Sequence, residues 1–142
     1  MLYVVDASVV LKWFLPEPGT AAADALLEQF LNNEAEFIAP DLLLLEIASA
    51  LWKRAIRKDL LPEEAIAVYR DLIALPLPLV PSGQFAEAAL SLALRHNHSI
   101  YDLLYCALAI ERNGELVTAD QTLVNKLGTD FPFITHLSTI KP

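Results

Sequence analysis

Four acidic residues of this sequence stand beside apolar runs. They are Asp6 after residues 3–5, Glu46 after residues 42–45, Asp102 after residues 99–101 and Asp120 after residues 115–119. A carboxylate in apolar surroundings is costly unless its charge is compensated. Four such groups in one place would also repel each other. A divalent cation would remove both problems and supply a catalyst, so the first hypothesis is a metal-dependent phosphodiester hydrolase.

The donor atoms in this set are all carboxylate oxygens, which select hard cations, namely Mg²⁺ or Mn²⁺. Each acid also has a simpler interpretation. Asp6 could form a turn, Glu46 could be a solvated helix position, and Asp102 and Asp120 could cap helices. Any one of them alone is weak evidence, but their order along the chain favours a metal site.

Strand and helix patterns alternate along the whole chain, and Pro and Gly residues separate them. The apolar runs predict strands at residues 2–5, 36–39, 77–80, 116–118 and 133–137. Helical spacing and cap residues predict helices over residues 20–31, 41–58, 62–75, 82–97, 99–113 and 120–127, with Asp41 and Ser82 as N-caps. This alternation is typical of an α/β three-layer sandwich around a central, mainly parallel sheet of four to five strands.

In open parallel sheets, ligands gather beyond the carboxyl ends of the strands. Asp6 directly follows the first predicted strand, and Asp120 follows the fourth. Glu46 lies about one turn into the helix after the second strand, and Asp102 lies in the first turn of another helix. Helix N-termini face the same edge of such a sheet, so we expect the four carboxylates to meet there.

Two hydroxyl residues lie close to these acids. Ser8 is two residues after Asp6, and Thr118 is two residues before Asp120. Either hydroxyl could orient a ligand carboxylate or a water molecule. Local turn or backbone hydrogen bonding explains them equally well.

The chain has 142 residues, of which 55% are hydrophobic and 20% charged, and its formal net charge is −8. This length suits one domain over residues 1–142. The surplus of apolar residues favours an oligomer over a monomer with a rich core. Because a nucleic-acid clamp usually carries a basic footprint, the charge argues against that class. It does not exclude an enzyme that meets phosphate through metal ions.

The single cysteine, Cys106, lies in an apolar helical run and is expected to be a core residue. A lone cysteine forms no internal disulfide, which fits a reducing compartment. The sequence has no secretory signal pattern at its start and no run of about 18 apolar residues. We therefore expect a soluble cytoplasmic protein without a membrane association.

Four sequence motifs together resemble the PIN-domain ribonucleases, and most nearly the VapC toxins of bacterial and archaeal toxin–antitoxin pairs. They are residues 5–8 (VDAS), 40–46 (PDLLLLE), 101–109 (YDLLYCALA) and 118–120 (TAD). The resemblance runs from residue 2 to the end of the chain. It implies that Asp6, Glu46, Asp102 and Asp120 are the family's acids and that Ser8 and Thr118 are its frequent hydroxyl positions. It further implies Mg²⁺- or Mn²⁺-dependent endoribonuclease activity, a homodimer and inhibition by a cognate antitoxin.

The mechanism expected from these residues is metal-assisted hydrolysis of RNA. Asp6, Asp102 and Asp120 would hold the metal directly, and Glu46 would do so directly or through water. The metal would make water more acidic, and Glu46 could accept the remaining proton.

Basic and aromatic residues offer further contacts to RNA. The candidates are Lys12, Arg54, Arg57 and Lys126, of which Arg54 and Arg57 belong to the basic segment 53–58. Cations at a helix C-terminus or on a solvated face explain them as well. His96 and His98 could bind zinc, but all-carboxylate partners argue for a helix cap or solvent exposure instead. Trp13 and Phe14 could stack on bases, serve a partner interface or, by default, pack internally.

Three other functions remain open. A phosphatase of the haloacid-dehalogenase type would carry an Asp-x-Asp pair after the first strand, but position 8 is Ser8. A non-enzymatic PIN-like scaffold in a protein complex would not need four intact acids. A structure-specific DNA nuclease usually carries extra elements for gripping a duplex, for which 142 residues leave little room.

Overall fold

The structure is a computed structural model that describes residues 1–140. The strands are β1 (Leu2–Val5), β2 (Glu36–Pro40), β3 (Leu79–Val80), β4 (Glu115–Thr118) and β5 (Ile134–His136). The α-helices are α1 (Ala7–Val10), α2 (Thr20–Leu31), α3 (Leu42–Ile56), α4 (Pro62–Ala74), α5 (Ala86–His96), α6 (Ile100–Arg112) and α7 (Gln121–Leu127). Short 3₁₀ turns span Leu11–Trp13, Ser82–Phe85 and Leu137–Thr139.

The five strands form one sheet in the order β3-β2-β1-β4-β5, and every neighbouring pair is parallel. The first strand is therefore central, with Tyr3 opposite Phe37 of β2 on one side and Glu115 of β4 on the other. Parallel neighbours require a crossover, which the intervening helices supply. This confirms the predicted α/β sandwich, with a fully parallel sheet of five strands.

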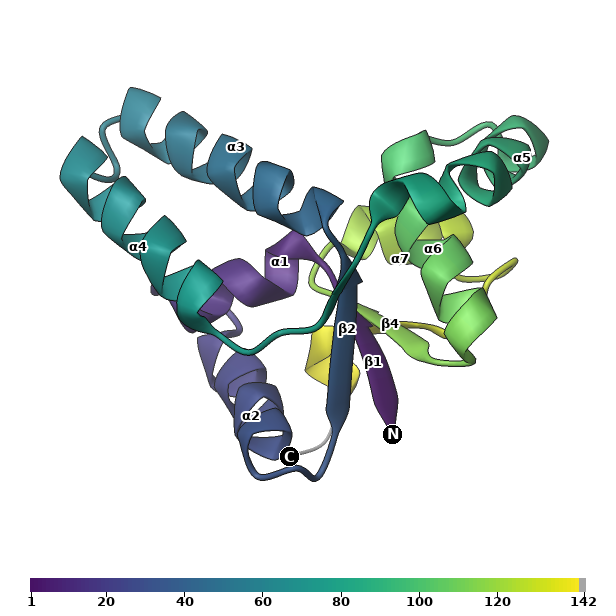
Figure 1. The fold of residues 1–142 in the computed structure, drawn as a ribbon, viewed down its shortest axis with the longest axis horizontal. Helices are drawn as coiled ribbons and strands as arrows, with labels where there is room; N and C mark the ends of the chain where they lie inside the picture. Colours follow the sequence, from purple (N-terminus) through teal and green to yellow (C-terminus); the bar gives the residue numbers. More distant parts are fainter. Residues whose placement is uncertain (141–142) are drawn as a thin grey trace.

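Helices cover both faces of the sheet (Figure 1). Val5 and Val117 pack into the core beneath α1, α2, α3 and α4, whereas Val4 and Leu116 pack against α5, α6 and α7. All four side chains are fully buried. Such burial of successive residues explains why the strands are continuous apolar runs without alternating polar positions. Within the residues that the structure describes, no helix combines the length and apolar composition needed to cross a bilayer.

Two predicted helix caps are wrong in detail. The Asp41 side chain does not cap α3; its Oδ1 accepts hydrogen bonds from the Ser82 backbone N–H (3.0 Å) and hydroxyl (2.6 Å). Ser82 Oγ in turn accepts from the Leu42 N–H (2.9 Å), so it caps α3 rather than its own helix, which begins only at Ala86. The reason is topological, because β2 and β3 are adjacent and end at the same edge of the sheet.

A short helix directly after the first strand was not predicted. Residues Ala7–Val10 form α1, and a 3₁₀ turn continues it to Trp13. The β-branched Val9 and Val10 have low helix propensity, but both are fully buried. Tertiary packing therefore overrides the local preference, and α1 continues directly from Asp6.

Candidate active site

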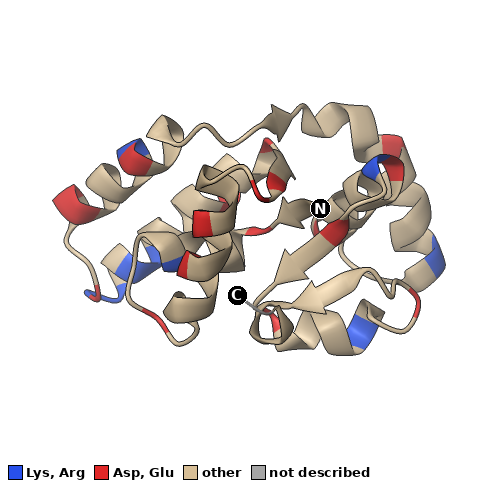
Figure 2. Ribbon diagram, turned by 90° about the horizontal axis from the view of Figure 1, so that it is seen from below, with Lys and Arg blue, Asp and Glu red and all other residues tan. Residues whose placement is uncertain are grey.

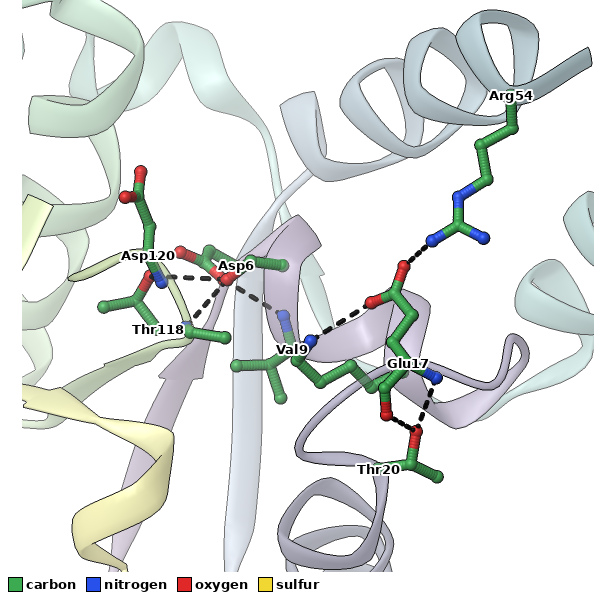
Figure 3. Close-up of polar contacts among 10 residues, drawn as sticks. Asp6, Val9, Glu17, Thr20, Arg54, Thr118 and Asp120 are labelled. Carbon is green, nitrogen blue, oxygen red and sulfur yellow. Dashed lines mark hydrogen bonds and ion pairs between the residues drawn. The ribbon is translucent and has the colours of Figure 1, made fainter. Parts of the chain in front are cut away.

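Asp6, Glu46, Asp102 and Asp120 line one cavity of about 150 Å³, together with Ser8 and Tyr105. Asp6 follows β1, Glu46 lies on α3, Asp102 lies in the first turn of α6, and Asp120 precedes α7. The cavity therefore lies beyond the carboxyl ends of the central strands, as the parallel topology predicts. Figure 3 shows Asp6 and Asp120 side by side above the end of the sheet.

Asp6 is held by the first turn of α1. Its Oδ1 accepts hydrogen bonds from the Ser8 hydroxyl (2.6 Å) and the Val9 N–H (3.3 Å), so it is the N-cap of that helix. Burial raises the pKa of Asp6, and these hydrogen bonds together with the Thr118 hydroxyl oppose the rise. The site thus keeps a desolvated carboxylate in place with neutral donors only.

Ser8 connects Asp6 to the segment after β4. The Ser8 oxygen accepts from the Ala119 N–H (2.8 Å) and lies 3.3 Å from the Thr118 hydroxyl. Because the single Ser8 hydroxyl proton is used on Asp6, Thr118 must be the donor in that contact. Thr118 is fully buried, and its oxygen also accepts from the Asp120 N–H (3.0 Å). The two predicted hydroxyls therefore belong to one network that joins Asp6 to Asp120.

Glu46 is held by Tyr105, a residue that the sequence reasoning missed. The buried Tyr105 hydroxyl donates to Glu46 Oε1 at 2.5 Å. Burial raises the pKa of Glu46, the Tyr105 hydrogen bond lowers it, and the charges of Asp6 and Asp102 raise it further. The Tyr105 pKa is raised by burial and by the Glu46 charge, so the phenol remains a donor. Its position three residues after Asp102, on the buried face of the same helix, was the signal available in the sequence.

Asp102 is held by a histidine for which only a helix cap or solvent exposure was expected. His98 Nε2 lies 2.7 Å from Asp102 Oδ2, across one helical turn, and 14% of the His98 side chain is exposed. His96 also differs from the expectation, since it packs on the ring of Phe131 and lies 3.4 Å from Asp130. The sequence therefore did not predict the partners of either histidine, which are Asp102 for His98, and Phe131 and Asp130 for His96.

Asp120 is the N-cap of α7. Its Oδ1 accepts from the Thr122 N–H (3.0 Å) and the Leu123 N–H (3.3 Å). The cap was one of two interpretations of this residue, and the structure shows that it coexists with a position on the cavity wall. Capping and a site at the sheet edge are compatible because only one carboxylate oxygen is needed for the cap.

The four carboxylates share this pattern of binding. Glu46, Asp102 and Asp120 each accept at one oxygen, and within residues 1–140 their other oxygen has no hydrogen-bond partner. The bonds from Ser8 and Val9 to Asp6 also fall on a single oxygen, Oδ1. No three His, Cys, Asp or Glu side chains in that range lie close enough together to grip an ion as they stand. The acids surround the cavity without closing on a common point. Their all-oxygen chemistry and the raised pKa values of Asp6 and Glu46 nevertheless fit a hard divalent cation.

The predicted RNA contacts occupy different settings. Lys12 and Arg54 both pair with Glu17, whereas Arg57 pairs with Asp59 at 3.4 Å on the surface. Lys126 is exposed on α7. Figure 2 shows the basic positions mostly toward the two ends of the ribbon, with no single basic stripe across it.

Two residues with open roles pack into the interior. Trp13 stacks on Phe37 with ring centroids 5.6 Å apart, and its indole N–H donates to the Ala23 carbonyl (2.9 Å). Cys106 is fully buried, and burial raises the pKa of its thiol to about 12. Both default expectations, internal packing and a core cysteine, are confirmed.

Residues 3–126 match the PIN domain family. The chain belongs to the PIN domain family. Its membership agrees with the resemblance drawn from the four motifs, and the match includes all four acids of the cavity.

Relatives of this PIN-domain chain are ribonucleases by name. It is 33% identical to Ribonuclease VapC3 of Pyrobaculum aerophilum over 128 residues. This aligned region covers 89% of this chain and 95% of the relative. It is 27% identical over 128 residues to Ribonuclease VapC12 of Mycobacterium tuberculosis, and the aligned region covers 89% of this chain and 93% of that relative.

Solved structures share the fold. A crystal structure of VapBC2 from Rickettsia felis, bound to a DNA fragment from its promoter, matches 96% of this chain and 97% of that one at a TM-score of 0.63 and 16% identity. A crystal structure of PAE2754 from Pyrobaculum aerophilum matches 98% of this chain and 91% of its own chain, at a TM-score of 0.62 and 19% identity. These similarities support the PIN fold of this chain.

Proposed function

We propose that this PIN-domain protein is a divalent-metal-dependent endoribonuclease and the toxin of a toxin–antitoxin pair. The observation that carries the proposal is the cavity itself: four acids from four separate elements line one space at the end of a parallel sheet. The ribonuclease names of its relatives agree with that chemistry.

In this proposal, Asp6, Asp102 and Asp120 hold a Mg²⁺ or Mn²⁺ ion through the carboxylate oxygens that their local hydrogen bonds leave available. Glu46 completes the set directly or through water. When bound, such an ion makes water more acidic and offsets charge that builds on the phosphate oxygens. The ion also balances four like charges that the protein itself compensates only with neutral donors and His98.

Glu46 is the proposed proton acceptor. Burial and the neighbouring acids raise its pKa, which moves a carboxylate toward the range that suits a general base. Tyr105 fixes one Glu46 oxygen at 2.5 Å and leaves the other for the cavity. The hydroxyl groups of Ser8 and Thr118 link the Asp6 carboxylate to the Asp120 backbone N–H by hydrogen bonds, which fixes the position of Asp6 relative to Asp120.

Partner chains belong to the same proposal. Exposed apolar side chains on α3 and α5 support both a homodimer and an antitoxin contact; they include Leu45, Trp52, Ile56, Leu90 and Leu94. The solved VapBC2 of Rickettsia felis is a neighbour in fold, and its name denotes a toxin–antitoxin pair. A toxin of this kind would meet its RNA in the cytoplasm. Light scattering on the purified chain, alone and with the product of the adjoining gene, would test both associations.

The nuclease proposal is tested by incubating the purified chain with RNA and Mn²⁺, with and without excess EDTA. We expect cleavage with Mn²⁺, none with EDTA, and a loss on the order of 10³-fold in Asp6→Asn, because several kcal/mol of charge stabilisation is removed. The matched control is Asp24→Asn, which removes an exposed acid on α2 and should cleave like the wild type. Wild-type rates in Asp6→Asn would end the assignment.

The same reaction separates the open alternatives. Turnover of small phosphoesters without RNA cleavage would indicate a phosphatase. Mn²⁺ that fails to bind in calorimetry would indicate a non-enzymatic scaffold. Cleavage of branched DNA in preference to RNA would indicate a structure-specific DNA nuclease.

A further inference from the structure

A second cavity, with charged residues in its lining, lies next to the acidic one. Its volume is about 540 Å³, and its lining includes Lys12, Glu17, Arg54, Ala119 and His136. Ala119 connects the two cavities, since it donates its N–H to Ser8 and directly precedes Asp120. Nothing in the proposed hydrolysis uses the charged groups of this second cavity.

Lys12 and Arg54 converge here on one carboxylate. Lys12 Nζ lies 3.1 Å from Glu17 Oε1, and the Arg54 guanidinium donates to Glu17 Oε2. The exposed fractions of the three side chains are 12% for Lys12, 16% for Glu17 and 25% for Arg54. Figure 3 shows Glu17 between α1 and Arg54, on the opposite side of Val9 from Asp120. The two cations are therefore held in fixed positions and partly withdrawn from water.

The loop that carries Glu17 is itself fixed. The Glu17 N–H donates to the Thr20 hydroxyl (3.0 Å), which donates back to the Glu17 carbonyl (2.7 Å). Gly19 has a φ of +89°, a backbone conformation that side-chain-bearing residues rarely adopt. The carboxylate is thus positioned by its own turn, and this order favours a preformed site.

His136 adds a further donor to the same cavity. Its Nδ1 accepts from the Ser138 backbone N–H (3.1 Å) and lies 2.8 Å from the Ser138 hydroxyl. A ring nitrogen that accepts an N–H bond carries no proton, so the neutral imidazole of His136 has its hydrogen on Nε2. The cavity is therefore lined by Lys12, Arg54 and a histidine, His136, whose Nε2 is a hydrogen-bond donor.

The charge balance of this cavity is positive. Two cations and the Glu17 carboxylate leave a net charge of +1 in a protein whose formal net charge is −8. Among the lining residues, all within the part of the chain that the structure describes, Glu17 is the one acid. N–H donors with a surplus positive charge suit a phosphate group. Because Ala119 of this cavity donates to Ser8 of the acidic one, a strand of RNA that enters the acidic cavity also passes this cavity.

We propose that Lys12, Arg54 and His136 form a subsite for the RNA backbone phosphate that flanks the scissile bond, in which the Glu17 carboxylate pairs with both cations and limits the net charge to +1. This inference rests on the proposed function, whose substrate it specifies. Its source of phosphate is the RNA strand itself.

The test measures binding rather than cleavage. A mixed-sequence single-stranded RNA is titrated by fluorescence anisotropy against the full chain in the Asp6→Asn background, over a series of salt concentrations. We expect Arg54→Gln and Lys12→Gln to weaken binding about tenfold and to flatten the salt dependence by about 0.7 in log K against log salt, the value for one phosphate contact of a single strand. Arg54→Lys, which keeps the charge, should retain the salt slope.

For Glu17→Gln we expect RNA affinity to change in the opposite direction. Removing the carboxylate raises the net charge of the cavity, so RNA should bind several-fold more tightly with a steeper salt slope. A merely structural ion pair would predict no gain in affinity. This variant also protects the test against misfolding, because an unfolded protein would not bind RNA more tightly.

Arg70→Gln is the matched control, since it removes one exposed positive charge on α4, away from this cavity. Binding by Arg54→Gln and Glu17→Gln that equals that of Arg70→Gln would overturn the subsite, even if the wild type cleaves RNA. Charge-dependent RNA binding as described, in a wild type that does not cleave RNA, would instead support the subsite and remove the nuclease assignment. Loss of binding to a protein partner with unchanged RNA affinity would assign the cavity to that partner and overturn the proposal.

Discussion

The two neighbouring cavities use charge in opposite ways. In the acidic cavity, three of the four carboxylates are bound by neutral donors, namely Ser8, Tyr105 and the backbone N–H groups of α1 and α7, and the fourth lies against His98. In the second cavity, Glu17 is bound by the two cations Lys12 and Arg54. The first arrangement leaves a surplus of negative charge, and the second satisfies its carboxylate completely.

This difference shows what each cavity can bind. Carboxylates held by neutral donors keep their full charge and repel each other; burial raises the pKa of Glu46, and the charges of Asp6 and Asp102 add to that rise. Such a site is stabilised by an added cation. In the second cavity, one carboxylate pairs with two cations, so the net charge is positive. An added anion therefore stabilises that cavity. Metal and phosphate would thus occupy adjacent places.

The largest expected effect is stabilisation by metal. Mn²⁺ at a free concentration of about 100 times Kd should stabilise the wild type by about 2.7 kcal/mol, seen as a rise in the melting temperature. Asp6→Asn should show a much smaller rise, because one ligand and one repulsive charge are lost. An unchanged melting temperature at millimolar Mn²⁺ would argue that the acidic cavity does not bind the ion.

The next effect concerns the support of Glu46. Tyr105→Phe removes the hydrogen bond to Glu46 Oε1, and we expect cleavage to fall by about 10–100-fold through kcat, with RNA affinity unchanged. Steady-state kinetics would separate the two parameters. Tyr69→Phe, on α4, is the control and should retain full activity.

The ion-pair cluster predicts a loss of folding stability. Glu17→Gln leaves Lys12 and Arg54 close together without a countercharge, and we expect a decrease of about 1–2 kcal/mol in the free energy of unfolding. Urea denaturation measures it. Glu28→Gln, an exposed position on α2, should change the midpoint little. A variant as stable as the wild type would show that the cluster contributes nothing to the fold.

The smallest effect is a pH dependence of the metal-free protein. The pKa of Asp6 is raised above its ordinary value of 3.8, so the folded state binds more protons than the unfolded state between those two values. Stability of the wild type therefore falls as pH rises through that window, whereas Asp6→Asn lacks this contribution. We expect the stability advantage of Asp6→Asn to be absent near pH 4 and to grow toward neutral pH. Urea midpoints measured in EDTA across this range would show a constant difference if the interpretation were wrong.

Much of the fold could be predicted from local patterns. The helix Thr20–Leu31 and the strand Leu2–Val5 have the predicted boundaries, and Asn113 ends α6 in the left-handed conformation expected of a C-cap. These features depend on periodicity and on residues near in sequence. The errors had a different cause, namely contacts made by tertiary packing. Helix α1 was missed because Val9 and Val10 disfavour a helix until they are buried, and Ser82 was assigned to the wrong helix because its partner Leu42 lies 40 residues away.

The candidate site divides in the same way. The positions of the four acids beside strand ends and helix starts were sufficient to predict that they line one space at the edge of the sheet. Their supports were less accessible, since Tyr105 and Glu46 are separated by 59 residues and Ser8 and Ala119 by 111. Lys12 and Arg54 were candidate RNA contacts, but their convergence on Glu17 in a second cavity was not predicted, because it depends on α3 packing beside the loop that carries Glu17.

The amino-acid sequence by itself determined the alternation of strands and helices, the parallel sheet and the edge at which the acids gather, because hydrophobic periodicity and topology act through short stretches of chain. Tertiary structure alone decided which donor holds each carboxylate and which cation meets Glu17. Hydrogen bonds and ion pairs act over a few ångströms, so they are settled only when packing has brought distant segments together.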